Sequence, residues 1–163
     1  MAATIMAWSE CTIKIGPSGA SGAMGTTLTS VGIIKDKSSS LEPSDGEVLE
    51  AKKTGGKTVA REQLEGGFLL KTRVIEPSDS LLTLLGLGEV ATNDFNVKTH
   101  VPAGNFSVEV VPRNVGAKGI KAPWCTITYK PGWSEEEGNF ADLEISILQG
   151  EAGYWYARTT KVA

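Results

Sequence analysis

The chain has 163 residues, a formal net charge of −3, 40% hydrophobic residues and 21% charged residues. These values are ordinary for a globular protein and predict a single domain over residues 1–163. The acidic balance disfavours a sequence-specific DNA-binding protein, because such proteins usually carry a basic face. No stretch reaches the ~18 apolar residues of a membrane span, and the first sixteen residues lack the features of a signal peptide. We therefore expect a protein that folds in a cytoplasm and has no membrane partner.

Short segments with a period of two dominate the chain and predict β-strands. The first strand is predicted over residues 10–15, ECTIKI. The glycine-rich residues 16–25 follow, and they predict a flexible connection. A further strand is predicted over residues 25–35, GTTLTSVGIIK. Inward and outward residues alternate in both strands: Cys11, Ile13 and Ile15 share a face, as do Leu28 and Ile34, while Val31 and Ile33 share the opposite one.

Residues 51–58, AKKTGGKT, end like a phosphate-binding loop. Such a loop needs a glycine where this chain has Ala51, and it needs a helix after it, whereas the residues after Thr58 are typical of a strand. We interpret the segment as a hairpin, because Gly55-Gly56 accepts the positive φ angles of a two-residue turn. The predicted register places Glu50 opposite Arg61 and Lys52 opposite Val59, in an arm over residues 47–64.

Neither face of the predicted arm is apolar, and a two-stranded ribbon without an apolar face is marginal in water. Two interpretations stay open: a solvated, mobile arm, or an arm that another subunit orders. The arm is basic toward its tip, and a turn later in the chain is acidic, which suits head-to-tail association of unlike surfaces. The candidate subunit-interface residues are Lys52, Lys53, Gly55, Gly56, Lys57 and Arg61 in the arm and Glu135, Glu136 and Glu137 in the turn.

After the arm, residues 66–77 predict a strand in which Phe68, Leu70, Thr72 and Val74 share one face. Residues 77–88 predict the one helix, with Ser78 or Asp79 as N-cap, Leu81, Leu84 and Leu85 at helical spacing, and Gly86 or Gly88 as its stop. The later segments FNVKTHV, NFSVEVVP, WCTITYK, FADLEISILQ and YWYARTTKV predict strands. The fold class is therefore mainly β: an antiparallel β-sandwich or partly closed barrel with one short α-helix and a long protruding hairpin.

The residues do not form a recognisable catalytic or metal-binding constellation, so we expect no enzyme, no cofactor and no metal. The one histidine, His100, is predicted at the surface at the end of a strand. Cys11 and Cys125 lie in strand-like segments, where a small buried residue is the usual role of cysteine. A nucleophile with a neighbouring base cannot be named from these residues.

The aromatic residues leave open a second function from another class. Trp124 and Trp133 flank a predicted strand, and Tyr154–Tyr156 are consecutive. An exposed aromatic platform stacks on sugars or bases, so a monomeric β-sandwich module that binds a ligand or glycan is the alternative. Core and interface packing is the other interpretation of the same residues.

The order of predicted elements over residues 31–86 resembles that of the major tail tube proteins of long-tailed bacteriophages. A strand ends at Lys35-Asp36 and a polar segment, Ser38–Ser40, follows it. A charged hairpin arm comes next, then the strand Phe68–Ile75, and then a short leucine helix that closes on Gly86. The tube proteins of contractile secretion systems share this general design.

The resemblance implies a structural protein of a phage or prophage tail that folds in the cytoplasm of the host bacterium. Its partners would be copies of itself, other tail proteins, and DNA that passes through without specific binding. Six copies would form a ring with a continuous inner barrel, and rings would stack into a tube. By position, Glu47–Leu64 would contact neighbouring rings, Ser78–Leu85 would be an outer helix, and Gly16–Gly25 would be a second contact ordered on assembly.

Overall fold

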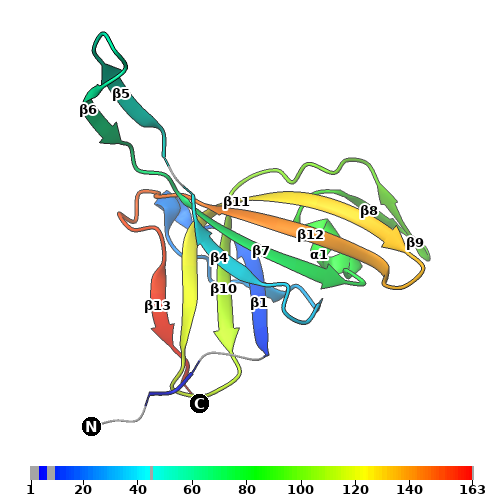
Figure 1. Ribbon diagram of the computed structural model, residues 1–163. Coiled ribbons are helices and arrows are strands. Elements are labelled where there is room, and N and C mark those ends of the chain that lie inside the picture. The colour runs from blue at the N-terminus through cyan, green and yellow to red at the C-terminus, as the bar shows by residue number, and fades with distance from the viewer. Residues whose placement is uncertain (1–3, 7–9, 45, 163) are drawn as a thin grey trace.

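The computed structural model describes residues 4–6, 10–44 and 46–162, and Figure 1 shows its ribbon. The protein is mainly β, with 52% of the chain in strands and 6% helical, and its main sheet is a curled antiparallel half-barrel. The predicted fold class is therefore confirmed in its partly closed form. The main sheet contains β1 (Cys11–Pro17), β2 (Thr29–Ser30), β3 (Ile33–Ile34), β4 (Ser40–Pro43), β7 (Phe68–Ile75), β10 (Phe106–Pro112), β11 (Lys118–Ser134), β12 (Gly138–Ile147) and β13 (Ala157–Thr160).

The remaining elements are two hairpins and two helical segments. The strands β5 (Val48–Lys52) and β6 (Thr58–Gln63) form the predicted arm, which protrudes from the half-barrel in Figure 1. The strands β8 (Gly88–Ala91) and β9 (Asp94–Val97) form the second hairpin. The helical segments are the 3-10 turn Ala20–Gly22 and the α-helix α1 (Asp79–Leu84). No helix among the described residues is long and apolar enough to cross a membrane.

The long strand β11 joins the two halves of the sheet. Its first part pairs with β10 on one edge and with β13 on the other, and its second part pairs with β12. Cys125 stands at the junction, since it is opposite both Phe106 of β10 and Ile147 of β12. Beyond β10 the order continues through β1 to β2, and beyond β12 it continues through β7, which pairs with both β3 and β4.

The alternation of side chains along β7 and β12 builds the core, as the sequence predicts. In β12 every second residue, from Ala141 to Ile147, is buried at 1% exposure or less, while the residues between them are half-buried. Each aliphatic side chain buried in this way contributes ~1.5–3 kcal/mol relative to an exposed one. The half-barrel is therefore apolar inside and polar on its outer face.

The helix α1 closes the interior of the half-barrel with leucine side chains. Ser78 caps it as predicted, since its side chain accepts a hydrogen bond from the backbone N–H of Leu81. The helix ends at Leu84 with Leu85 as its C-cap, and the φ of +74° at the following Gly86 lets the N–H of Leu87 bond the carbonyl of Leu82. Leu81, Leu85 and Leu87 are fully buried and Leu82 is 9% exposed, whereas Leu84 is only half-buried. Within the helix, the buried stripe thus contains Leu82 in place of the predicted Leu84.

Two predictions about the first forty residues are wrong. Residues 25–35 do not form one strand, because Gly32, at φ +100°, separates the short strands β2 and β3, which lie at opposite ends of the sheet order. Residues 16–25 are not a flexible connection: Gly25 is buried and its N–H donates to the Ser107 hydroxyl, at 2.7 Å. Contacts within the chain already order this segment, which removes the reason to expect that assembly orders it.

Candidate subunit interface

The arm confirms part of the predicted register and corrects its tip. Glu50 lies opposite Arg61, with 3.6 Å between a carboxylate oxygen and the guanidinium Nε. The loop has three residues rather than two, since the N–H of Lys53 bonds the carbonyl of Lys57 at 3.0 Å. A shift in register follows Ala51, so Lys52 pairs with Thr58 and not with Val59. Gly55 and Gly56 both have positive φ, as the turn prediction requires.

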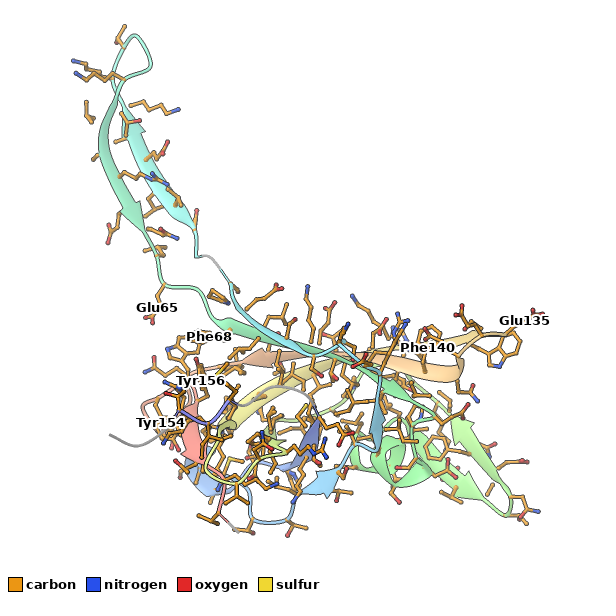
Figure 2. The ribbon with its side chains drawn as sticks, turned by 60° about the horizontal axis from the view of Figure 1, so that its bottom comes forward. Glu65, Phe68, Glu135, Phe140, Tyr154 and Tyr156 are labelled. Carbon is orange, nitrogen blue, oxygen red and sulfur yellow. The ribbon has the colours of Figure 1, made fainter. Side chains whose placement is uncertain are left out.

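The arm stands clear of the rest of the molecule. Residues 47–65 are all exposed. Among the described residues, no side-chain hydrogen bond or ion pair links residues 47–64 to the half-barrel. The backbone pairing at its base runs through Ser44, whose N–H bonds the carbonyl of Gly67 at 2.7 Å. Figure 2 shows the side chains of the arm surrounded by open space. No described residue outside the arm therefore covers either face of this ribbon.

One face of the arm is more apolar than the sequence analysis indicates. We call this surface the arm face, and it follows from the register, which pairs Leu49 with Glu62 and Ala51 with Ala60 while Leu64 bonds back to Glu47. It comprises Glu47, Leu49, Ala51, Ala60, Glu62 and Leu64. Leu49 and Leu64 are 46% and 41% exposed, although leucine is a residue that folding usually buries. On the arm face each of the two leucines thus lies opposite a glutamate.

The tip of the arm keeps its positive charge. Lys52 lies 3.9 Å from Glu50, which is already paired with Arg61. Within the described part of the chain, Lys53 and Lys57 have no ion-pair partner closer than 4.0 Å. The arm is therefore divided into a basic tip and an acidic, partly apolar shaft.

Glu137, one of the predicted interface residues, is engaged in ion pairs within its own chain. Its carboxylate lies 2.5 Å from the ammonium of Lys35 and 3.1 Å from the guanidinium of Arg73, and its side chain is only 19% exposed. Arg73 also binds Asp142 through two nitrogens, at 2.6 and 3.0 Å. The hydrogen bond from Lys35 is the main reason that the pKa of Glu137 is lowered, and the bond to Asp142 raises the pKa of Arg73.

The ion pairs of Glu137 should make the stability of the fold depend on pH in the acidic range. A carboxylate whose pKa is lower in the folded state than in the unfolded state stabilises the fold at pH values above its ordinary pKa. That contribution is lost as the pH falls through the pKa of the folded state. We expect the Glu137→Gln variant to unfold at a lower urea concentration than the wild type at neutral pH, and the two midpoints to converge below about pH 4.5. Urea midpoints measured from about pH 7 to about pH 3 check this. Glu135→Gln is the matched control and should follow the wild type at every pH.

Glu135 and Glu136 remain exposed at the end of the β11–β12 hairpin. Figure 2 places Glu135 far from the arm, on the other side of the molecule. One copy therefore does not bring the basic tip and the acidic turn together, and only a second copy could join them.

The outer face of the half-barrel carries ion pairs between adjacent strands, which the sequence patterns did not predict. On adjacent strands, Lys130 lies 2.9 Å from Glu144, and Arg73 binds Asp142 while its guanidinium stacks 4.4 Å above the ring of Phe140. The charged residues Lys130, Asp142 and Glu144 are visible in the sequence. Their pairing depends on the register of β11 with β12, which the sequence does not supply.

The aromatic residues serve mainly in packing. Phe68 makes edge-to-face contacts with Trp155 and Tyr156, with ring centroids 5.8 and 5.1 Å apart. Trp133 is 68% exposed, beside the β11–β12 turn. Trp124 lines an open cavity of about 610 Å³ together with polar residues that include Asn105, Gln149 and Glu151.

The two cysteines differ in burial. Cys125 is fully buried, and burial raises the pKa of its thiol to about 12. Cys11 is half-buried, and burial raises its thiol pKa as well. A thiol with a raised pKa is a poor nucleophile at neutral pH, because little of it is thiolate. His100 is exposed after β9, where the sequence predicts a surface residue.

Comparison with known proteins leaves the family open: no protein-family model matches this sequence, and no curated protein is significantly similar to it.

Proposed function

We propose that this protein is a structural subunit that assembles with copies of itself into rings, and that the rings stack as the tail tube of a phage or prophage. The single observation that carries the proposal is the arm, since residues 47–65 are all exposed and bury nothing against their own half-barrel. A two-stranded ribbon gains little stability alone. An exposed ribbon with apolar side chains on it is therefore suited to a contact with another molecule.

The sheet face supports the same proposal. In a tube, DNA would pass along one surface of the sheet, and strong phosphate contacts would retard it. On the outer face of the half-barrel, Arg73 and Lys130 are each bound to a carboxylate, so neither is free to hold a phosphate. This arrangement suits a six-membered ring whose lumen conducts DNA without binding it specifically, in a virion tail that also contains other tail proteins.

The basic tip supplies the first test of assembly. We expect the triple change Lys52→Glu, Lys53→Glu and Lys57→Glu to leave the melting temperature unchanged, because exposed charges contribute little to folding. The same change should block stacking, because like charges across a contact oppose association. Negative-stain electron microscopy of the concentrated protein checks this, with rings or tubes expected for the wild type only.

The matched control changes the same three lysines to arginine, which keeps the charge. Tubes should persist in this control. If the glutamate variant also forms tubes, the tip does not contribute to the contact. A wild type that stays monomeric at every salt and protein concentration would overturn the proposed function itself.

The cavity beside Trp124 is the observation that favours the alternative, a monomeric module that binds a ligand or glycan. Its polar lining by Asn105, Gln149 and Glu151 is compatible with a hydroxylated ligand. However, Trp155 packs against Phe68 and Trp133 stands apart from the cavity wall, so the aromatic residues do not form a shared platform. The assembly proposal accounts for the arm, and the ligand-binding alternative does not.

A further inference from the structure

A second exposed apolar surface lies where residues 4–6 and 161–162 contact the connection between β10 and β11. We call it the terminal patch, and its members are Ile5, Met6, Val115 and Val162, which are 48%, 51%, 54% and 80% exposed. A patch of this kind on a soluble protein marks an interaction site more often than an isolated apolar residue does.

Three segments build the terminal patch and hold it together. The side-chain amide of Asn114 donates to the carbonyl of Met6 at 3.3 Å, and the N–H of Gly116 donates to the carbonyl of Lys161 at 2.9 Å. Ile5 packs over Gly116, where a Cβ would lie 2.7 Å from the Ile5 Cδ1 atom. Residues 4–6, 113–117 and 161–162 therefore form one surface.

The surroundings of the terminal patch are basic. The side chain of Arg113 is 63% exposed, and Lys118 is exposed at the start of β11. The ammonium of Lys161 bonds the carbonyl of Arg113 at 2.7 Å, which places it on the same rim. Glu10 lies 4.0 Å from Arg113 and offsets one of these charges. The rim thus keeps a positive excess around an apolar centre.

The arm face has the complementary composition, with the apolar Leu49 and Leu64 beside the carboxylates of Glu47 and Glu62. Figure 1 shows the arm leaving the half-barrel at the opposite end from the two chain termini. One copy cannot bring these two surfaces together. Unlike surfaces at opposite ends of a molecule give a head-to-tail contact that repeats from copy to copy.

We propose that the arm face of one copy docks on the terminal patch of the next copy. The contact buries the exposed leucines of the arm against Val115 and Val162 and places the arm carboxylates on the basic rim. This inference rests on the proposed function, since it names the two surfaces through which the copies stack. It assigns the shaft of the arm, rather than its lysine tip, to the apolar part of the contact.

Disulfide cross-linking tests the geometry directly. The chain with Leu49→Cys and Val115→Cys, in a Cys11→Ser background, is assembled and treated with the thiol oxidant diamide. We expect a ladder of covalent oligomers on a non-reducing gel. The matched control has Val48→Cys in place of Leu49→Cys, on the opposite arm face, and should give at most a weak ladder. Equal ladders from the two chains, or none from the first, would overturn the proposed docking.

A charge exchange provides an independent measurement of the same contact. Glu62→Lys alone and Arg113→Glu alone should each raise the concentration needed for half-assembly by at least about tenfold, because each places like charges together. The chain that carries both changes restores an opposite pair and should assemble near the wild-type concentration. All four proteins should melt alike, since both residues are exposed.

The outcomes separate the two proposals. If the wild type assembles but neither the cross-link nor the rescue appears, the docking on the terminal patch is wrong and the tube subunit stands. If the wild type never assembles, both are overturned.

Discussion

A chain without its arm is expected to remain folded and to lose assembly completely. The variant replaces Glu47–Leu64 with Asn-Gly, a pair that favours the tight turn of a two-residue hairpin. The two ends that remain are already close: a Cβ on Gly46 would lie 2.8 Å from the carbonyl carbon of Glu65, and the N–H of Ser44 bonds the carbonyl of Gly67. Since residues 47–65 are all exposed, their loss removes no buried contact from the half-barrel. Changes confined to exposed surface usually stay within ~0.5 kcal/mol.

Two measurements on the armless chain check this expectation. Its melting temperature should lie within about 2 °C of the wild-type value, because about 1 kcal/mol moves the midpoint by only ~2–4 °C in a domain of this size. Sedimentation velocity should show a single monomeric species at concentrations where the wild type forms large particles. Large particles from the armless chain would remove the observation that carries the proposed function. A large loss of melting temperature would mean that the arm belongs to the folding unit.

Local sequence patterns were sufficient to predict the elements that bury only one of their faces. The alternation in 141–147 predicts both faces of β12. The two candidates for each end of α1 include the observed cap, Ser78, and the observed positive-φ residue after the helix, Gly86. These predictions succeed because period and capping are properties of a few adjacent residues. Residues 25–35 fail the same test, because Gly32 turns the chain and only the tertiary fold decides where each half pairs.

The candidate interface was predictable only in part. The arm and its basic tip follow from residues near Gly55-Gly56, yet the length of the loop did not, and one extra loop residue moved Lys52 from Val59 to Thr58. Glu137 forms ion pairs with Lys35 and Arg73, which lie 102 and 64 positions before it in the sequence. The terminal patch likewise joins residues 4–6 and 161–162 to residues 113–117. No pattern within one segment reports such contacts.

Replacement of Leu81 by alanine is expected to cost ~2–5 kcal/mol of unfolding free energy, the largest effect of a single substitution proposed for this chain. Leu81 is fully buried in the core that α1 shares with β7 and β12. Alanine is the best helix former, so the loss reports the lost packing and the remaining cavity rather than helix propensity. A domain with a typical stability of ~5–15 kcal/mol would become marginal at the lower end of that range.

Urea unfolding midpoints provide the measurement, and Leu84→Ala is the matched control. Leu84 lies in the same helix but is only half-buried, so its truncation should cost clearly less. An equal loss of unfolding free energy in the two variants would show that the burial of Leu81 is not what holds α1 in the core. Because α1 lies in the core and far from the arm tip, the Leu81→Ala chain should still assemble at a temperature where it is folded. Folding and assembly would then depend on different residues, as expected if the arm acts only between copies.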